Sequence, residues 1–143
     1  ADPRVVVMER TNARYLAHLD EPVDLVVVDA SFISLELLLP AVAGWLRPGG
    51  DVIALVKPQF EAGREQVGKG GVIRDEAVHR QVLDELISWA IARGWRLAGA
   101  TASPLRGPAG NVEFFLWLTT SPDVPALDSD EAVARAIASV PLP

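Results

Sequence analysis

The stretch VDLVVVDASFISLELLLPAVAGWLRPGGDVIALVK, residues 23–57, decides the fold. It contains two mostly apolar runs, Val23–Val28 and Asp51–Val56, with a segment of helical spacing between them. Continuous apolar strands are typical of parallel sheets that are covered on both faces. Strands that alternate with helices in this way predict an α/β fold built on a doubly wound parallel sheet.

The same alternation continues on both sides of this stretch. Arg4–Glu9 is expected to form a short buried strand, and irregular or helical chain follows it to Asp20. Ser31 or Ser34 can cap a helix that runs to about residue 46, where Pro40 predicts a kink or a later start. The remaining expected elements are a long glycine-rich loop at 57–74, a helix at 75–94, strands at 96–102 and 111–119, a linker at 121–125 and a short helix near 131–139.

Composition limits the class of protein. A chain of 143 residues, half of them hydrophobic, is sufficient for one ordinary globular domain. It has no apolar run of the roughly 18 residues that span a membrane, no signal peptide and no cysteine, so we expect a cytosolic protein without disulfides or a metal site. The net charge of −6 argues against a general nucleic-acid clamp, although cations outnumber anions in the loop at 57–74.

Three charged residues stand at or beside the ends of predicted strands: Asp29, Lys57 and Glu113. A charge in such a place costs free energy unless it is paired or used, and open α/β sheets bind ligands at these strand ends. Taken alone, Asp29 could be a turn residue and Lys57 a surface lysine. Glu113 would share a strand face with Phe115 and Trp117, which favours a functional role over a solvated one.

Four segments carry a resemblance to a known family: ERTNARYL (9–16), VDLVVVDASFISLELLLPAV (23–42), VKPQFEAGREQVGKGGVIRD (56–75) and SPLRGPAGNVEFFLWL (103–118). They closely resemble the TlyA family, which belongs to the FtsJ-like branch of S-adenosylmethionine-dependent RNA methyltransferases. The resemblance implies a Rossmann-like methyltransferase sheet and methylation of ribose 2′-hydroxyls in ribosomal RNA. Members are also called haemolysins, but no segment of this sequence supports a pore.

The resemblance implies a role for particular residues. Asp29, Lys57 and Glu113 match three members of the family's Lys-Asp-Lys-Glu catalytic tetrad. The first lysine, the glycine-rich cofactor loop and a small RNA-binding domain have no counterpart here, so the isolated chain is expected to lack full activity. Residues 1–120 would be the carboxyl-terminal portion of the methyltransferase domain, and residues 121–143 a linker with a short helix.

The same resemblance implies sites for the cofactor and the substrate. The expected S-adenosylmethionine contacts are Asn12, Asp29, Ser31 and Phe32. The expected contacts with RNA phosphates are Arg64, Lys69 and Arg74. Simpler interpretations remain for each set: a helix start for the asparagine, a core position for the phenylalanine and a solvated loop for the three cations.

Methyl transfer to a ribose hydroxyl requires the hydroxyl to be held in line and to lose its proton. Lys57 is the candidate for this work. Neighbouring carboxylates favour its charged form, whereas burial and a nearby cofactor cation favour the neutral amine. The sequence leaves open whether the carboxylates orient Lys57 or activate it.

Two further expectations concern alternatives and partners. A non-catalytic RNA- or ribosome-binding module with a decayed methyltransferase fold is the competing function. Methyltransferase sheets of this kind order their strands 3-2-1-4-5-7-6, and this chain would begin at strand 3. Val23–Val28 would then be an exposed sheet edge, so we expect a rearranged amino-terminal strand or edge-to-edge pairing with a second copy.

Overall fold

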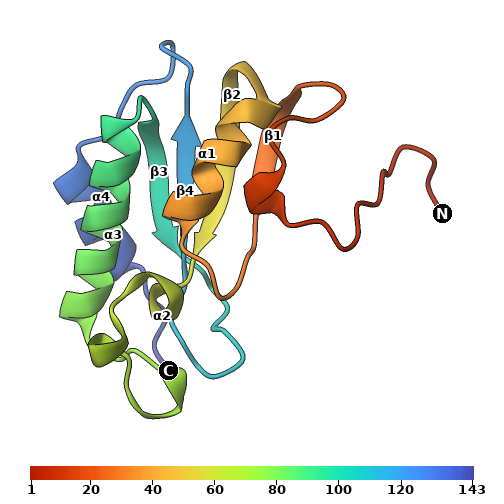
Figure 1. Ribbon diagram of the computed structural model, residues 1–143. Helices are drawn as coiled ribbons and strands as arrows, with labels where there is room; N and C mark the ends of the chain where they lie inside the picture. The colour runs from red at the N-terminus through yellow and green to blue at the C-terminus, as the bar shows by residue number, and fades with distance from the viewer.

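The computed structural model describes residues 1–143 and contains one four-stranded sheet flanked by helices (Figure 1). The strands are β1 (Val23–Val28), β2 (Leu46–Val56), β3 (Arg96–Ala102) and β4 (Phe114–Thr119), in the spatial order β1-β2-β4-β3. This order corresponds to the 4-5-7-6 part of the expected sheet, and the α/β fold class is confirmed.

The sheet is mixed rather than parallel throughout. β1 and β2 are parallel, whereas β4 runs antiparallel to both β2 and β3. A single loop joins β3 directly to β4, and neighbouring strands joined without a crossover helix run antiparallel. The expectation of a wholly parallel sheet is therefore wrong at its carboxyl-terminal end.

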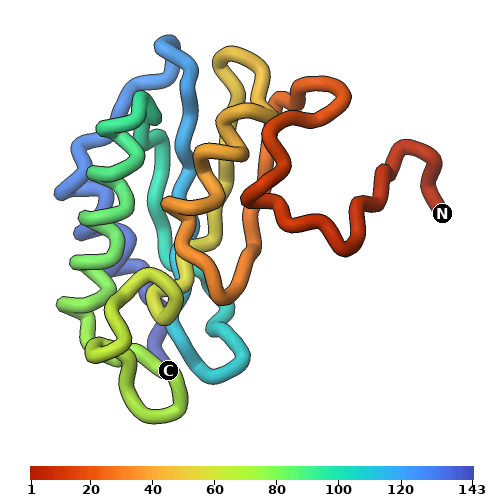
Figure 2. The backbone as a smooth tube through the Cα atoms, viewed as in Figure 1, coloured from red at the N-terminus to blue at the C-terminus, as the bar shows by residue number.

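Three helices of several turns pack around the sheet: α1 (Leu35–Trp45), α3 (Glu76–Ala92) and α4 (Ser129–Ala138). Of the two expected caps for α1, Ser34 takes this role, and Pro40 lies inside α1 without delaying its start. Asp75 caps α3 at the start of the helix expected at 75–94. α1 and α3 lie on the same face of the sheet (Figures 1 and 2). α4 follows the free edge of β3, where Ser139 Oγ accepts a hydrogen bond from the Ala102 N–H.

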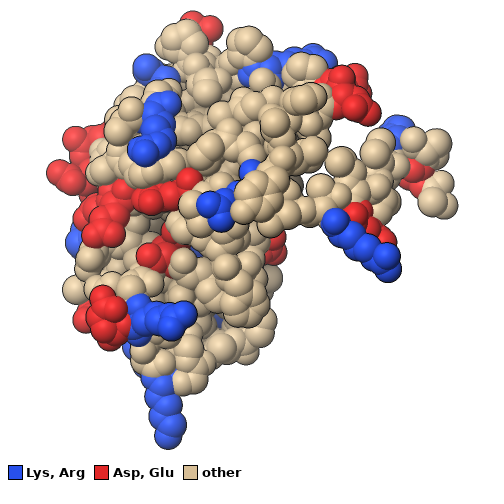
Figure 3. Space-filling model, viewed as in Figure 1, with Lys and Arg blue, Asp and Glu red and all other residues tan.

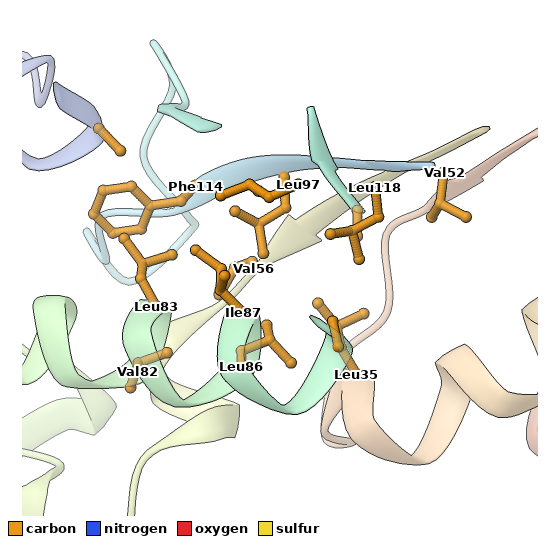
Figure 4. Packing of buried hydrophobic residues seen from close by; sticks show 14 of the residues in the cluster. Leu35, Val52, Val56, Val82, Leu83, Leu86, Ile87, Leu97, Phe114 and Leu118 are labelled. Carbon is orange, nitrogen blue, oxygen red and sulfur yellow. The ribbon is translucent and has the colours of Figure 1, made fainter. Parts of the chain in front are cut away.

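The core lies between the sheet and these helices (Figure 4). Alternate residues of the two central strands point toward the helices, as the two-residue period of a strand requires. From α3, Leu83 and Ile87 fill the space beneath Phe114 and Leu97 (Figure 4). The apolar residues of these two strands that are fully enclosed are Val52, Ala54, Val56, Phe114, Leu116 and Leu118.

The opposite face of the sheet and its β1 edge remain partly exposed. Leu25 is 54% exposed, Val27 72% and Trp117 37%. The expected buried strand at 4–9 does not form: this segment extends away from the domain (Figure 2), and Val6 is 82% exposed. A strand needs a neighbour to satisfy its backbone groups, and none lies beside this segment.

Several expected boundaries also differ. β2 begins at Leu46 rather than at Asp51 and so includes Arg47–Gly50; an irregularity opposite Asp24 accommodates these residues. β4 begins at Phe114 rather than at residue 111. The loop at 57–74 contains short helical turns: α2 (Pro58–Glu61), η2 (Arg64–Gln66) and η3 (Lys69–Gly71). The turn η1 (Ala13–Tyr15) precedes β1.

Candidate active site

Lys57 is held between two groups from the neighbouring strand end. Its Nζ lies 2.7 Å from Asp29 Oδ1 and donates a hydrogen bond to Ser31 Oγ at 3.0 Å. β1 and β2 are adjacent and parallel, so the residues that follow them emerge side by side at one edge of the sheet. The Lys57 side chain is only 14% exposed, whereas that of Asp29 is 71% exposed. The lysine is therefore fixed in direction and largely withdrawn from solvent.

Glu113 lies in the same pocket as Lys57. The pocket has a volume of about 790 Å³, and its wall includes Lys57, Ser31 and Glu113. Glu113 immediately precedes β4 and is only 7% exposed, yet its carboxylate makes no ion pair and no side-chain hydrogen bond within the chain. A Cβ at Gly107 would approach Glu113 Oε2 to 3.1 Å, so a larger residue there would push against this carboxylate and require it to shift. The structure thus brings the acid and amine into one pocket without pairing them.

Sequence analysis missed two polar residues of this pocket, Gln59 and Asn111. Asn111 is 2% exposed and joins two loops: its Oδ1 accepts from the Ile73 N–H at 2.9 Å, and its Nδ2 donates to the Gly71 carbonyl at 2.8 Å. In the sequence, a lone asparagine between a glycine and a valine indicates only a turn. Its burial under the glycine-rich segment becomes evident only in three dimensions.

Phe32 and Phe60 form an aromatic pair at the pocket, with ring centroids 4.8 Å apart. Phe32 is 89% exposed and adopts φ of 63°, a left-handed backbone conformation that costs free energy for a residue with a side chain. The alternative that Phe32 is a core residue is therefore wrong. An exposed ring held at a strained position beside a pocket can stack on a flat ligand.

The four residues expected to contact the cofactor do not share one pocket. Asn12 and Asp29 line a second pocket of about 330 Å³ between η1, α1 and the end of β1. Asn12 Oδ1 also accepts from the Arg14 N–H, which is the plain helix-start role. Ser31 and Phe32 instead face the Lys57 pocket. Asp29 stands between the two pockets, since it lines one and pairs with the lysine of the other.

The three cations expected to meet RNA are also dispersed. Arg64 lines the Lys57 pocket, and Arg74 lines a neighbouring pocket together with Arg106. Lys69 is exposed on η3 and lines neither. On the face shown in Figure 3, acidic side chains gather over the region of α3, and cationic ones are scattered singly. The chain presents separate cations around its pockets rather than one continuous basic surface on this face.

Comparison with known proteins assigns the chain to a family. The FtsJ-like methyltransferase family model matches residues 1–120, so the chain belongs to the FtsJ-like methyltransferase family. It is 49% identical over 144 residues to the 16S/23S rRNA (cytidine-2′-O)-methyltransferase TlyA of Mycobacterium tuberculosis, covering 98% of this chain and 54% of that protein. It is 38% identical to Hemolysin A of Brachyspira hyodysenteriae, covering 79% of this chain and 48% of that protein.

A crystal structure of a Lactococcus lactis protein that is assigned as a hemolysin has a similar fold. The TM-score is 0.83 at 41% sequence identity, and the match covers 94% of this chain and 67% of that one. The chain spans about half the length of the curated relatives it matches. None of its helices combines the length and the apolar character that crossing a membrane requires.

Proposed function

We propose that this chain is part of an S-adenosylmethionine-dependent enzyme that methylates ribose 2′-hydroxyls in ribosomal RNA. The observation that carries the proposal is the Lys57–Asp29 pair at 2.7 Å, with Glu113 in the wall of the same pocket. Membership in the FtsJ-like family and the name of the M. tuberculosis relative support the reaction and the substrate. An RNA substrate of this kind implies a cytosolic protein.

Lys57 positions the reacting hydroxyl in this proposal. The ammonium pairs with Asp29 and donates one hydrogen bond to Ser31 Oγ, which leaves it able to donate another to the ribose 2′-oxygen in the pocket. This arrangement favours the orienting role of the carboxylate that the sequence left open. The Glu113 carboxylate has no partner in the chain and is the group placed to accept the hydroxyl proton. Holding an attacking group in line is itself a large contribution to rate.

S-adenosylmethionine, when bound, supplies a methyl group made electrophilic by its sulfonium. The residues of the second pocket fit the adenosine end of such a ligand, because an apolar wall that includes Val28 and Ile33 carries three polar residues: Thr11 and the two expected contacts, Asn12 and Asp29. These two residues would bind the cofactor from the side opposite the lysine. Ser31 would act through Lys57, and the loop that grips the rest of the cofactor would lie outside this chain.

The substrate side of the pocket suits a nucleotide. Phe32 offers an exposed ring for stacking on a base, and Arg64 stands at the same pocket for a phosphate. Lys69 and Arg74 would contact phosphates farther along the RNA. The ion-pairing role of these cations predicts binding that weakens as salt rises.

The test uses the full product of the gene, unmethylated ribosomal subunits and S-adenosylmethionine with a labelled methyl group. We expect label in the rRNA at a position that becomes resistant to alkaline hydrolysis, since a 2′-O-methyl group blocks that cleavage. The competing function, a non-catalytic RNA-binding module, predicts subunit binding with no label incorporated. Label on a base rather than on a ribose would contradict the proposed chemistry.

A further inference from the structure

Glu61 joins the two loops that carry the candidate catalytic residues. It is the last residue of α2, the short helix that begins directly after Lys57. Its Oε2 accepts a hydrogen bond from Ser34 Oγ at 2.6 Å, and its Oε1 accepts from the Leu35 N–H at 2.8 Å. Ser34 and Leu35 begin α1, which follows the loop carrying Asp29. One carboxylate thus fastens the chain beyond β2 to the chain beyond β1.

The direct tie between the two loops is weak by comparison. The Lys57–Asp29 pair involves a carboxylate that is 71% exposed, and solvent screens exposed ion pairs so that they contribute little to stability. Glu61 is mostly buried, and hydrogen bonds to an ionised group are shorter and stronger than neutral ones. The Leu35 N–H also belongs to the first turn of α1, where a negative charge is favourable.

Burial and repulsion from other acids both disfavour an ionised carboxylate at Glu61. Burial raises the pKa of Glu61, and repulsion from nearby Glu36 raises it further, whereas the bonds from Ser34 and Leu35 lower it. Glu85 lines the same small pocket and adds a third acid. The two hydrogen bonds are therefore the reason that Glu61 stays where it is.

We propose that Glu61 is a positioning residue: by clasping the amino terminus of α1, it keeps the Lys57 ammonium within reach of Asp29 and Ser31. The proposal rests on the proposed function for its catalytic consequence, but the clasp itself can be tested without activity. Without the clasp, α2 and Lys57 move independently of the Asp29 loop. Lys57 then spends more time in solvent and less in the pocket with Glu113.

The test is competitive labelling of amines in the folded chain, because the chain contains only two lysines, Lys57 and Lys69. Lys69 is exposed and serves as an internal reference, while Lys57 is paired and largely buried. A limiting amount of acetic anhydride is added, and the ratio of acetylation at the two lysines is read by peptide mass spectrometry. Wild-type Lys57 is expected to react more slowly than Lys69.

Glu61→Ala should raise the labelling of Lys57 relative to Lys69 several-fold. Glu61→Gln should restore the wild-type ratio, since its amide can accept from the Leu35 N–H and donate to Ser34 Oγ. Glu65→Ala is the matched control, because Glu65 is an exposed acid of the same loop, and it should leave the ratio unchanged. Circular dichroism and thermal unfolding show that each variant is folded. Ser34→Ala, which removes one of the two bonds to Glu61 together with the N-cap bond from the Glu36 N–H, serves if Glu61→Ala does not fold.

An unchanged Lys57 ratio in folded Glu61→Ala, or in Ser34→Ala if that variant is used, would overturn the proposal. In the full gene product, Glu61→Ala is expected to lower kcat for rRNA methylation with little change in KM, and Glu61→Gln to recover it. Loss through KM alone would also overturn the positioning role. If the labelling ratio responds as expected but the wild-type full gene product puts no methyl label on rRNA ribose, the clasp stands and the proposed function fails.

Discussion

Replacing Asn111 by alanine should loosen the wall of the candidate active site. The Asn111 side chain is 2% exposed, and it makes two hydrogen bonds, to the Ile73 N–H and the Gly71 carbonyl. These bonds fasten the loop that ends at Glu113 to the glycine-rich segment. Ile73 is itself 2% exposed, so its N–H would be left without a partner at a cost of about 1–3 kcal/mol. Gly71 is exposed, and water can satisfy its carbonyl.

With the lost packing of the side chain, the total is about 2–4 kcal/mol. For a domain of this size that corresponds to a fall in Tm of roughly 5–15 °C. Differential scanning calorimetry measures it, and hydrogen exchange should show faster loss of protection at the Ile73 amide. Asn111→Asp is no rescue, because it keeps the acceptor for Ile73 but turns an oxygen toward the Gly71 carbonyl. It should destabilise at least as much as alanine.

Asn12→Ala is the matched control, since Asn12 is exposed and accepts a single hydrogen bond from the Arg14 N–H. If Asn111→Ala melts together with Asn12→Ala and the Ile73 amide keeps its protection, the reasoning about this buried asparagine is wrong.

Three further predictions follow from other parts of the structure. Burial lowers the pKa of His79 below its ordinary 6.5, so the unfolded chain takes up the proton first and the free energy of unfolding should fall as the pH drops below about 6.5. Urea unfolding at several pH values measures this fall, and His79→Gln should make the free energy of unfolding depend less on pH. Calorimetry of residues 1–143 with S-adenosylmethionine should show very weak or no binding, and micromolar affinity would contradict the proposal that the main cofactor loop lies elsewhere. The exposed β1 edge should make the chain self-associate, and Val27→Lys should reduce this in light scattering, whereas a clean wild-type monomer would count against edge pairing.

The central part of the fold could be predicted because local signals and burial agree there. Local signals specify the elements that form: apolar runs at β1 and β2, caps at Ser34 and Asp75, and a glycine, Gly94, just beyond the end of α3. The antiparallel placement of β4 could not be read from β-branched and aromatic residues alone. It follows from the absence of a crossover helix between β3 and β4.

The segment at 4–9 shows the limit of local reasoning most clearly. Its residues have the composition of a buried strand, yet Val6 is 82% exposed because no strand lies beside it. Strand formation depends on a partner that a local sequence window does not contain. The same reasoning applies to β1, whose outward residues would be buried beside a further strand.

The sequence indicated the acids and the amine of the candidate site, but not the residues whose hydrogen bonds hold its loops in place. Asp29 and Lys57 follow adjacent strands, so strand order alone brings them together. Glu61 and Asn111 bind residues far away in the sequence, and no spacing rule indicates such contacts. The division of the cofactor set between two pockets likewise depends on side-chain direction, which the sequence does not specify.

The most direct test of the central claim compares the only two lysines of the chain in the full gene product. Because the partner of Lys57 is largely exposed, Lys57→Ala should cost no more than about 1 kcal/mol of stability. The account predicts that Lys57→Ala lowers kcat for rRNA 2′-O-methylation by about a hundredfold or more. Lys69→Ala removes a phosphate contact away from the reacting atoms, so it should change KM and leave kcat unchanged. If folded Lys57→Ala methylates rRNA as fast as Lys69→Ala, the claim that Lys57 positions the reacting hydroxyl is wrong.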